Sequence, residues 1–182
     1  GDTARLPYGT KSAETIIRYT HQNVAFLLSK KIDLLIVACN TASAHAMSEL
    51  RKTLALPVLG VIEPGARRAA AVSATGRIGV IGTRGTILSG MYQKFILSHR
   101  PDAVVHVSPA PILVPLVEEG LTTGPITEAA IRLYVDPMME KKVDTLVLGC
   151  THYPIIRNQI SRFLNFEVNV LDEILSVEQA FH

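Results

Sequence analysis

The two cysteines of the chain each close the same kind of segment. Cys39 ends the run KIDLLIVAC and Cys150 ends the run KVDTLVLGC, and the two cysteines lie 111 residues apart. Each run is a short apolar stretch of the kind that forms a buried parallel strand. Polar, hydrogen-bonding residues follow both cysteines, Asn40-Thr41 in the first copy and Thr151-His152 in the second. The sequence therefore predicts two related half-sites with a thiol at a strand end in each.

Two such thiols favour proton transfer over other cysteine chemistry. A thiolate at a helix N-terminus has a lowered pKa, so cysteine becomes a good base near neutral pH. One activated cysteine would suggest nucleophilic acyl chemistry, whereas a symmetric pair suggests removing a proton from one face of a carbon and returning one to the other face. Such a racemase must exclude water and direct donors at the carboxylate that gathers charge. Asn40, Thr41, Thr151 and backbone N–H groups are the candidate donors.

A disulfide or two inert buried cysteines are the structural alternatives. The composition carries no mark of secretion, which disfavours a disulfide. Two inert thiols at equivalent places in a repeat, each followed by Thr and one also by His, would be a coincidence.

The repeat extends beyond the cysteines and predicts a strand–helix–strand unit used twice. A helix-like stretch over 42–54 leads to a strand over 57–62, and a similar stretch after Cys150 leads to a strand over 166–172, which indicates an internal duplication. The first remaining expectation is a helix opened by Ser12 and ending in the basic pair Lys30-Lys31. Strands are expected over 32–38, 77–83 and 104–107, and irregular backbone around Pro109, Pro111 and Pro115. Further helices are expected over 66–72, after a turn at Glu63-Pro64-Gly65, from Thr83 onward, and over 126–141. Alternating strands and helices predict a parallel, doubly wound α/β sheet with ligands at the carboxyl ends of its strands.

Composition narrows the function classes. Net charge is +2 and charged residues make up 19% of the chain, with the basic residues scattered, so no nucleic-acid partner is expected. No apolar run reaches the roughly 18 residues of a membrane helix, and we expect a soluble cytoplasmic protein. The histidines lack metal-ligand spacing, so no metal is expected. The Thr83–Thr86 turn resembles an anion-binding turn but lacks the spacing of a nucleotide fingerprint.

Six segments taken in order give the chain a family resemblance. They are GDTARLPYG at 1–9, ACNTAS at 38–43, VLGVIEPG at 58–65, GVIGTRGTI at 79–87, VPLVE at 114–118 and LGCTHYP at 148–154. Together they resemble the glutamate racemase family over nearly the whole chain. The cysteine motifs are specific to the aspartate/glutamate racemase group, and the Asp2–Gly9 loop narrows the resemblance to glutamate.

The resemblance implies a cofactor-independent, two-base enzyme that interconverts L- and D-glutamate for peptidoglycan. Cys39 and Cys150 would be the bases, His152 would assist Cys150, and Glu118 would be a helper near His152. The implied substrate contacts are Tyr8, Gly9, Asn40, Thr41, Thr151 and His152. Without the resemblance, Tyr8 would read as a packing residue, His152 equally as a capping or core histidine, and Glu118 as a solvated helix residue.

The resemblance also implies two similar α/β domains with the active site between them. We expect a first domain over 1–62, incomplete and joined by 173–182, and a second over 63–172. The family begins with a strand ending in an Asp-Ser-Gly turn that this chain lacks, together with a C-terminal tail, so weak or no activity is expected of the chain itself. Asp2 is expected to fix its own loop rather than to replace the missing Asp. A homodimer is left open.

Two other functions compete with this one. The first is a related racemase or decarboxylase acting on aspartate, a hydantoin or a malonate, although the cysteine pair argues against a one-cysteine decarboxylase. The second is a racemase-like domain that only binds an acidic ligand. Replacing either cysteine with serine separates them, because a binding domain keeps its affinity whereas a racemase loses turnover.

Overall fold

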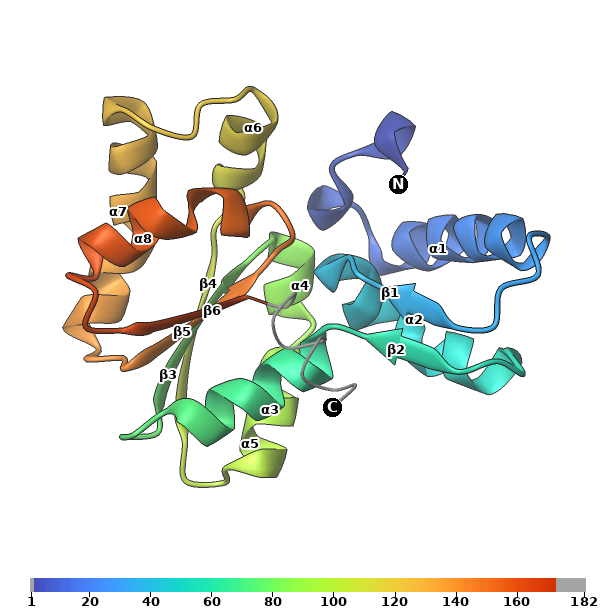
Figure 1. Ribbon diagram of the computed structural model, residues 1–182, viewed down its shortest axis with the longest axis horizontal. Coiled ribbons are helices and arrows are strands. Elements are labelled where there is room, and N and C mark those ends of the chain that lie inside the picture. Colours follow the sequence, from blue (N-terminus) through green and yellow to red (C-terminus); the bar gives the residue numbers. More distant parts are fainter. Residues whose placement is uncertain (1, 173–182) are drawn as a thin grey trace.

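The computed structural model describes residues 2–172, which form two parallel β-sheets with helices packed around them (Figure 1). The smaller sheet consists of β1 (Leu35–Val37) and β2 (Val58–Gly60). The larger sheet has the strand order β4 (Val104–Pro109), β3 (Arg77–Gly82), β5 (Thr145–Gly149) and β6 (Asn169–Asp172). Every neighbouring pair of strands is parallel. The predicted α/β class with doubly wound parallel sheets is confirmed.

The duplicated unit is visible in both sheets. In each copy a strand ends at a cysteine, helical structure follows, and the next strand returns parallel to the first. The connecting elements are α2 (Asn40–Thr53) in the first copy, and a 3₁₀ turn, η3 (Tyr153–Ile156), with α8 (Arg157–Phe163) in the second. Lys31 and Lys142, at equivalent places before the two strands, both have left-handed φ values, 57° and 54°.

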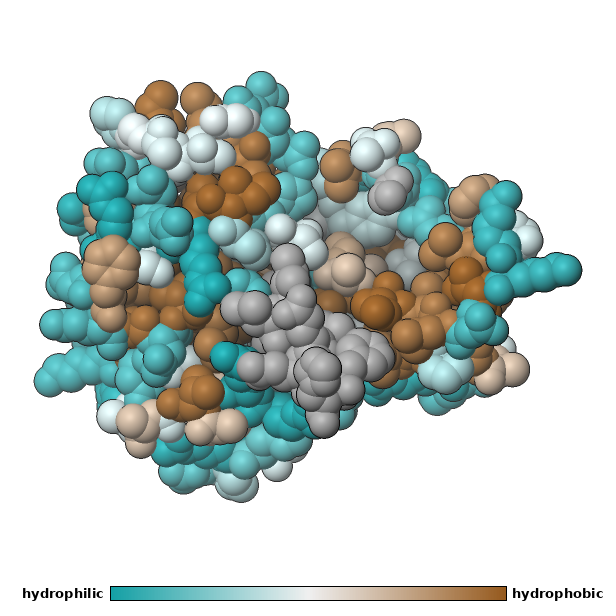
Figure 2. All heavy atoms as spheres, in the orientation of Figure 1, coloured by the Kyte–Doolittle hydropathy of each residue, from teal (hydrophilic) through white to brown (hydrophobic). Residues whose placement is uncertain are grey.

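The smaller sheet is covered by α1 (Ala13–Leu28) and α2, and it is preceded by two 3₁₀ turns, η1 (Thr3–Arg5) and η2 (Tyr8–Thr10). The Ser12 hydroxyl caps α1 by accepting the Thr15 N–H at 3.3 Å, as predicted. Leu35 and Val37 are buried against the two helices, whereas Ile36 points the other way and is 43% exposed. Figure 2 shows the resulting hydrophobic surface over this sheet.

The larger sheet is covered on both faces. One face packs against α3 (Ile62–Val72) and α5 (Met91–His99), the other against α6 (Leu113–Glu118), α7 (Pro125–Glu140) and α8. Side chains alternate along β5, so Val147 faces the first group while Leu146 and Leu148 face the second. All of β5 is buried, which explains why Leu146, Val147 and Leu148 form an uninterrupted apolar run.

The predicted turn at Glu63-Pro64-Gly65 is wrong, because these residues form the first turn of α3. Proline lacks an N–H, but N–H groups in a first helical turn have no intrahelical acceptor, so Pro64 is tolerated there. The strand expected over 57–62 accordingly ends at Gly60. Taking proline and glycine as turn signals therefore placed the start of this helix too late in the sequence.

The irregular backbone expected around Pro109, Pro111 and Pro115 is also wrong at two of these prolines. β4 continues to Pro109, and it is an edge strand, where a missing N–H disrupts little. Pro115 lies inside α6, again near its start. Conversely, the helix expected from Thr83 is two helices, α4 (Arg84–Leu88) and α5, separated at Gly90, whose φ of 67° breaks the helix.

Other expected elements differ in length. The strand expected over 32–38 is limited to Leu35–Val37, and the helix after Cys39 begins two residues earlier than expected. The domain boundary between 62 and 63 stays a prediction, and the expectation that 173–182 join the first domain lies outside the described residues. Among helices of residues 2–172, none is long and apolar enough to cross a membrane.

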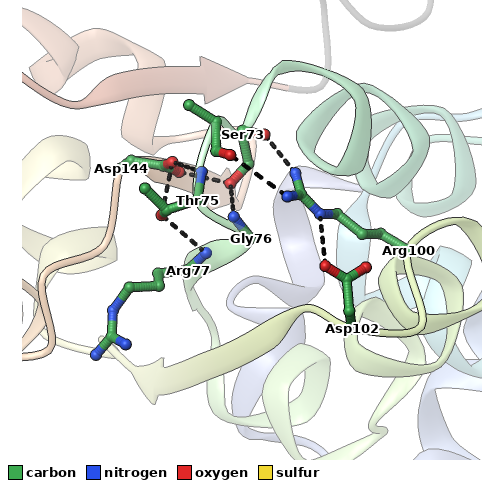
Figure 3. Close-up of polar contacts among 8 residues, drawn as sticks. Ser73, Thr75, Gly76, Arg77, Arg100, Asp102 and Asp144 are labelled. Atoms are coloured by element: carbon green, nitrogen blue, oxygen red, sulfur yellow. Dashed lines mark hydrogen bonds and ion pairs between the residues drawn. The ribbon is translucent and has the colours of Figure 1, made fainter.

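At the N-terminal ends of β3 and β5, away from Cys150, a partly buried polar network surrounds Asp144 (Figure 3). The Asp144 carboxylate accepts the Ser73 hydroxyl at 2.6 Å, and the N–H and hydroxyl of Thr75 at 2.5 and 2.8 Å. Burial alone would raise the pKa of Asp144, but these hydrogen bonds outweigh it and hold the pKa below its ordinary value. Arg100 donates to the carbonyl oxygens of Ser73 and Ala74 on the same turn. Asp144 thus ties the start of β5 to the loop before β3.

Candidate active site

A cavity of about 840 Å³ lies between the two sheets and is lined by segments from both. Its walls come from the Asp2–Thr10 segment, α1, β1 and the residues after it, the first turns of α2 and α4, α6, and the turn after β5. All the predicted site residues line it, namely Tyr8, Gly9, Cys39, Asn40, Thr41, Glu118, Cys150, Thr151 and His152. The structure thus brings the two cysteine motifs to one space, while the individual roles of these residues stay predictions.

Cys39 lies at the N-terminus of α2. Its backbone is extended (φ −73°, ψ 120°), it occupies the N-cap position, and its carbonyl accepts the Ser43 N–H at 2.8 Å. Asn40 and Thr41 are the first two residues of the helix. Because the free N–H groups of a first helical turn carry partial positive charge, this position favours the thiolate form of Cys39.

Asn40 is 2% exposed, and its side chain does not cap α2. Its Oδ1 accepts the hydroxyl of Tyr92, on α5, at 2.7 Å. Its Nδ2 has no hydrogen-bond partner among residues 2–172. A buried amide donor without a partner is costly in a protein interior, and this donor belongs to a residue of the cavity wall.

Thr41 joins the two halves through a cluster of three hydroxyls. Its Oγ1 lies 2.8 Å from the Oγ1 of Thr83 and 3.2 Å from that of Thr86, and the last two are 3.0 Å apart. Thr83 also caps α4, accepting the Thr86 N–H at 3.3 Å. The sequence singled out the Thr83–Thr86 turn only as a weak anion site and missed its contact with Thr41, which requires two distant segments to meet.

Gly9 lies against the same cluster. A Cβ atom at this position would be 2.3 Å from the Cβ of Thr83, closer than real Cβ contacts. Any larger residue would push η2 away from the start of α4. Close approach, rather than backbone conformation, thus requires glycine here.

Cys150 is 5% exposed and directly follows β5. Its Sγ lies 3.6 Å from Nδ1 of His152, and Nε2 of His152 forms a short hydrogen bond with Oε1 of Glu118, at the end of α6. With Nε2–H donating to the carboxylate, Nδ1 is left to accept the thiol proton. Glu118, His152 and Cys150 therefore form a proton-accepting chain.

The turn that holds this chain is anchored by Tyr153. Its ring is fully buried and its hydroxyl donates to the Ala110 carbonyl at 2.8 Å. Burial, and secondly the charge of Cys150, raise the pKa of Tyr153 far above its usual range, so it stays a neutral donor. Thr151, which precedes His152, lines the cavity and is exposed.

Tyr8 faces the cavity from η2, but its hydroxyl is already engaged. It donates to the Asp2 carboxylate in a short bond and accepts the Asn23 Nδ2–H at 3.1 Å. Burial first, and the bond to Asp2 second, raise the pKa of Tyr8 to about 12. Asp2 is also 2.6 Å from Arg5, so it fixes its own loop in the way expected from the resemblance.

Within residues 2–172 no group of three or more His, Cys, Asp or Glu side chains is arranged to hold a metal ion. Cys39 and Cys150 are not joined by a disulfide, which contradicts the disulfide alternative.

The chain is similar in sequence to known racemases. The family model for Asp/Glu/hydantoin racemases matches residues 2–176. A glutamate racemase from Geobacter metallireducens is 52% identical over 94% of this chain and 64% of its own length, and one from Aquifex aeolicus is 51% identical over 94% and 66%. The chain therefore spans about two thirds of the length of these relatives.

Solved structures give the same result. A glutamate racemase isoform from Bacillus anthracis superposes with a TM-score of 0.95 at 37% identity, covering 100% of this chain and 69% of that one. The enzyme from Francisella tularensis, solved in complex with D-glutamate, has a TM-score of 0.92 at 36% identity, covering 100% and 67%. An aspartate racemase from Picrophilus torridus, at 20% identity, 86% and 64% coverage and a TM-score of 0.60, shares the fold alone.

Proposed function

The chain belongs to the Asp/Glu/hydantoin racemase family, and from this premise we propose that it interconverts L-glutamate and D-glutamate without a cofactor. Glutamate is favoured over aspartate and hydantoins because the relatives at about half identity are glutamate racemases, whereas the aspartate racemase likeness extends to the fold only. The observation that carries the proposal is the single cavity lined by both cysteines.

The proposed reaction uses the two thiols in turn. One cysteine, as the thiolate, takes the α-proton and becomes a thiol, and the carbanion that remains takes a proton from the thiol of the other cysteine, on the opposite face. The substrate is inverted, and the negative charge passes from one cysteine to the other. Exchange of the proton between the two thiols through solvent restores the starting state after each inversion, so no acid or base is consumed overall.

On the Cys150 side, His152 prepares the thiolate for the direction in which Cys150 is the base. Before the α-proton is removed, Nδ1 of His152 accepts the thiol proton, and the resulting imidazolium is stabilised by the Glu118 carboxylate at Nε2. In the opposite direction the Cys150 thiol gives its proton to the carbanion. Glu118 therefore acts through His152, as a positioning and charge-balancing group. Burial of Cys150 makes this partner important, because a buried thiolate without a nearby cation is costly.

On the Cys39 side, the helix supplies the stabilisation. Backbone N–H groups at the start of α2 stabilise both the thiolate and a carboxylate bound beside it. The partnerless Nδ2 of Asn40 is a donor for that carboxylate as negative charge develops on it. The hydroxyl of Thr41, already bonded to Thr83 and Thr86, contributes less to that carboxylate. Thr151 would offer a hydroxyl from the other side of the cavity.

The biological role follows from the reaction. We propose that the D-glutamate supplies peptidoglycan synthesis in the cytoplasm. Assembly as a homodimer remains a prediction from the family resemblance.

Chiral chromatography of reactions started from L-glutamate, D-glutamate and L-aspartate tests the proposal. We expect both glutamate enantiomers to approach an equal mixture and aspartate to stay unchanged. His99→Gln, an exposed histidine at the end of α5, serves as the control variant and should match the parent chain. Glutamate binding without any inversion would identify the chain as a binding domain, and faster turnover of aspartate would assign it to the related racemases.

A further inference from the structure

Four side chains at the rim of the cavity form a closed ring of hydrogen bonds. Arg5 donates to Asp2 at 2.6 Å and to Oδ1 of Asn23 at 3.1 Å. Asn23 in turn donates from Nδ2 to the Tyr8 hydroxyl at 3.1 Å, and Tyr8 donates to the same oxygen of Asp2 that Arg5 contacts. Asp2, Tyr8 and Asn23 all line the cavity. Each donor in this ring has an acceptor in it, so the ring holds the Asp2–Thr10 segment on α1.

Arg5 is the member that no other residue type can replace. Besides Asp2 and Asn23, its guanidinium donates to Gln22, and it lies over the ring of Tyr19 at 4.1 Å. A planar, forked cation is needed to satisfy three acceptors and to stack on an aromatic ring at once. Lysine offers a point charge without this geometry.

Asp2 makes the charge of Arg5 important for an anionic ligand. The Asp2 side chain is 12% exposed and lies in the cavity wall, and its pKa is lowered chiefly by the hydrogen bond from Arg5, so it stays ionised. Unpaired, this carboxylate would repel a dicarboxylate in the same cavity. Arg5 neutralises it from the side of η1.

The ring also connects to the first cysteine motif. Tyr8 is followed by Gly9, which packs against Thr83, and Thr83 contacts Thr41 at 2.8 Å. Thr41 is the second residue after Cys39. Movement of the Asp2–Thr10 segment would therefore change the packing at Thr83 beside this motif.

We propose that Arg5 is a positioning residue of the site, one that seats Tyr8 and Gly9 against α4 and cancels the charge of Asp2, so that a dicarboxylate can bind. The inference rests on the proposed function for its ligand. Arg5 touches neither thiol, and its loss therefore acts on affinity for glutamate rather than on the proton-transfer step.

Arg5→Gln tests this in the full chain, with D-glutamate as the ligand. We expect the Kd from calorimetry and the KM for glutamate each to rise about tenfold or more, while kcat changes less than about threefold. Arg5→Lys should restore only part of the affinity, since the charge returns without the fork. Arg18→Gln is the matched control, because Arg18 is exposed on α1 and lies over the same Tyr19 ring at 5.4 Å, outside the hydrogen-bonded ring.

The double variant Arg5→Gln/Asp2→Asn separates the charge from a general loss of structure. Removing the carboxylate should recover affinity to within about threefold of the parent chain, which a misfolded segment would not do. An unchanged KM in Arg5→Gln, a loss confined to kcat, or a double variant weaker than the single one would overturn the proposal. A parent chain that binds glutamate but does not invert it would contradict the proposed function alone, since the affinity comparison still stands. A parent chain that binds no glutamate would overturn both.

Discussion

The two cysteine half-sites share a backbone plan and differ in the residue two positions after the thiol. In the second copy this residue is His152, which lies beside Cys150 and is held by Glu118 from the same sheet unit. In the first copy it is Thr41, whose hydroxyl bonds directly to Thr83 and Thr86 beside the other sheet. The second half thus keeps an acid–base group beside its thiol, whereas the first half uses its polar side chain to join the two sheets. The same strand–helix–strand unit therefore holds an acid–base group in one half and a contact between the two sheets in the other.

His152→Gln should have the largest effect on turnover of the variants that test how the two half-sites differ. Glutamine keeps a polar group but cannot take the proton of Cys150, so we expect kcat to fall about 10²–10⁴-fold, as for other lost acid–base groups. Thr41→Val, at the equivalent place in the first copy, should lower kcat no more than about tenfold, because Thr83 and Thr86 still bond to each other. Racemisation rates from both enantiomers measure this, and equal losses in the two variants would mean that the half-sites are not specialised.

The two copies also differ in how much Asp144 and Asp33 contribute to the free energy of unfolding. They occupy equivalent places in the repeat, but Asp144 accepts three hydrogen bonds from Ser73 and Thr75, whereas Asp33 is exposed. We expect Asp144→Asn to lower the free energy of unfolding by about 2 kcal/mol and Asp33→Asn to change it by less than about 0.5 kcal/mol. Urea denaturation gives both values.

The effect of Asp144 also depends on pH. Its pKa is lower in the folded protein than the ordinary value of 3.8, so its contribution is complete above that value and is lost as the pH falls through the folded pKa. The difference in stability between the parent chain and Asp144→Asn should therefore be constant near neutral pH and narrow below about pH 4. A difference that is equally large at pH 3 would show that the substituted amide destabilises the turn for a steric reason instead.

Lys31 and Lys142 test what the two copies share, with the smallest effect. Both follow the end of a helix and have φ values near 55°, a conformation that costs an ordinary residue about 1 kcal/mol. Glycine relieves this cost but loses more conformational freedom on folding, so Lys31→Gly and Lys142→Gly should each stabilise the chain by no more than about 0.5 kcal/mol. Thermal unfolding compares them, and a gain in one copy only would show that the two turns are held differently.

The sequence predicted the parts of the site that lie next to each other along the chain. The cysteines at strand ends, and His152 beside Cys150, follow from short-range spacing and from the period of buried strands. The contacts from Thr83 and Thr86 to Thr41, and the ring around Arg5, join segments distant in sequence, so no local pattern signals them. The start of α3 was missed because proline in a first helical turn looks the same in a sequence as proline in a turn. Glu118 was named from the resemblance, and only the position of α6 brings it to His152.

Exchange of the α-proton of glutamate in D₂O, followed by proton NMR from each enantiomer, tests the two-base account most directly. The parent chain should exchange the proton of both L- and D-glutamate. Cys39→Ser and Cys150→Ser should each abolish inversion, and any residual exchange should be confined to one enantiomer in the first variant and to the opposite enantiomer in the second. If either variant still inverts glutamate, or if both retain exchange of the same enantiomer, the two thiols do not act on opposite faces of the substrate.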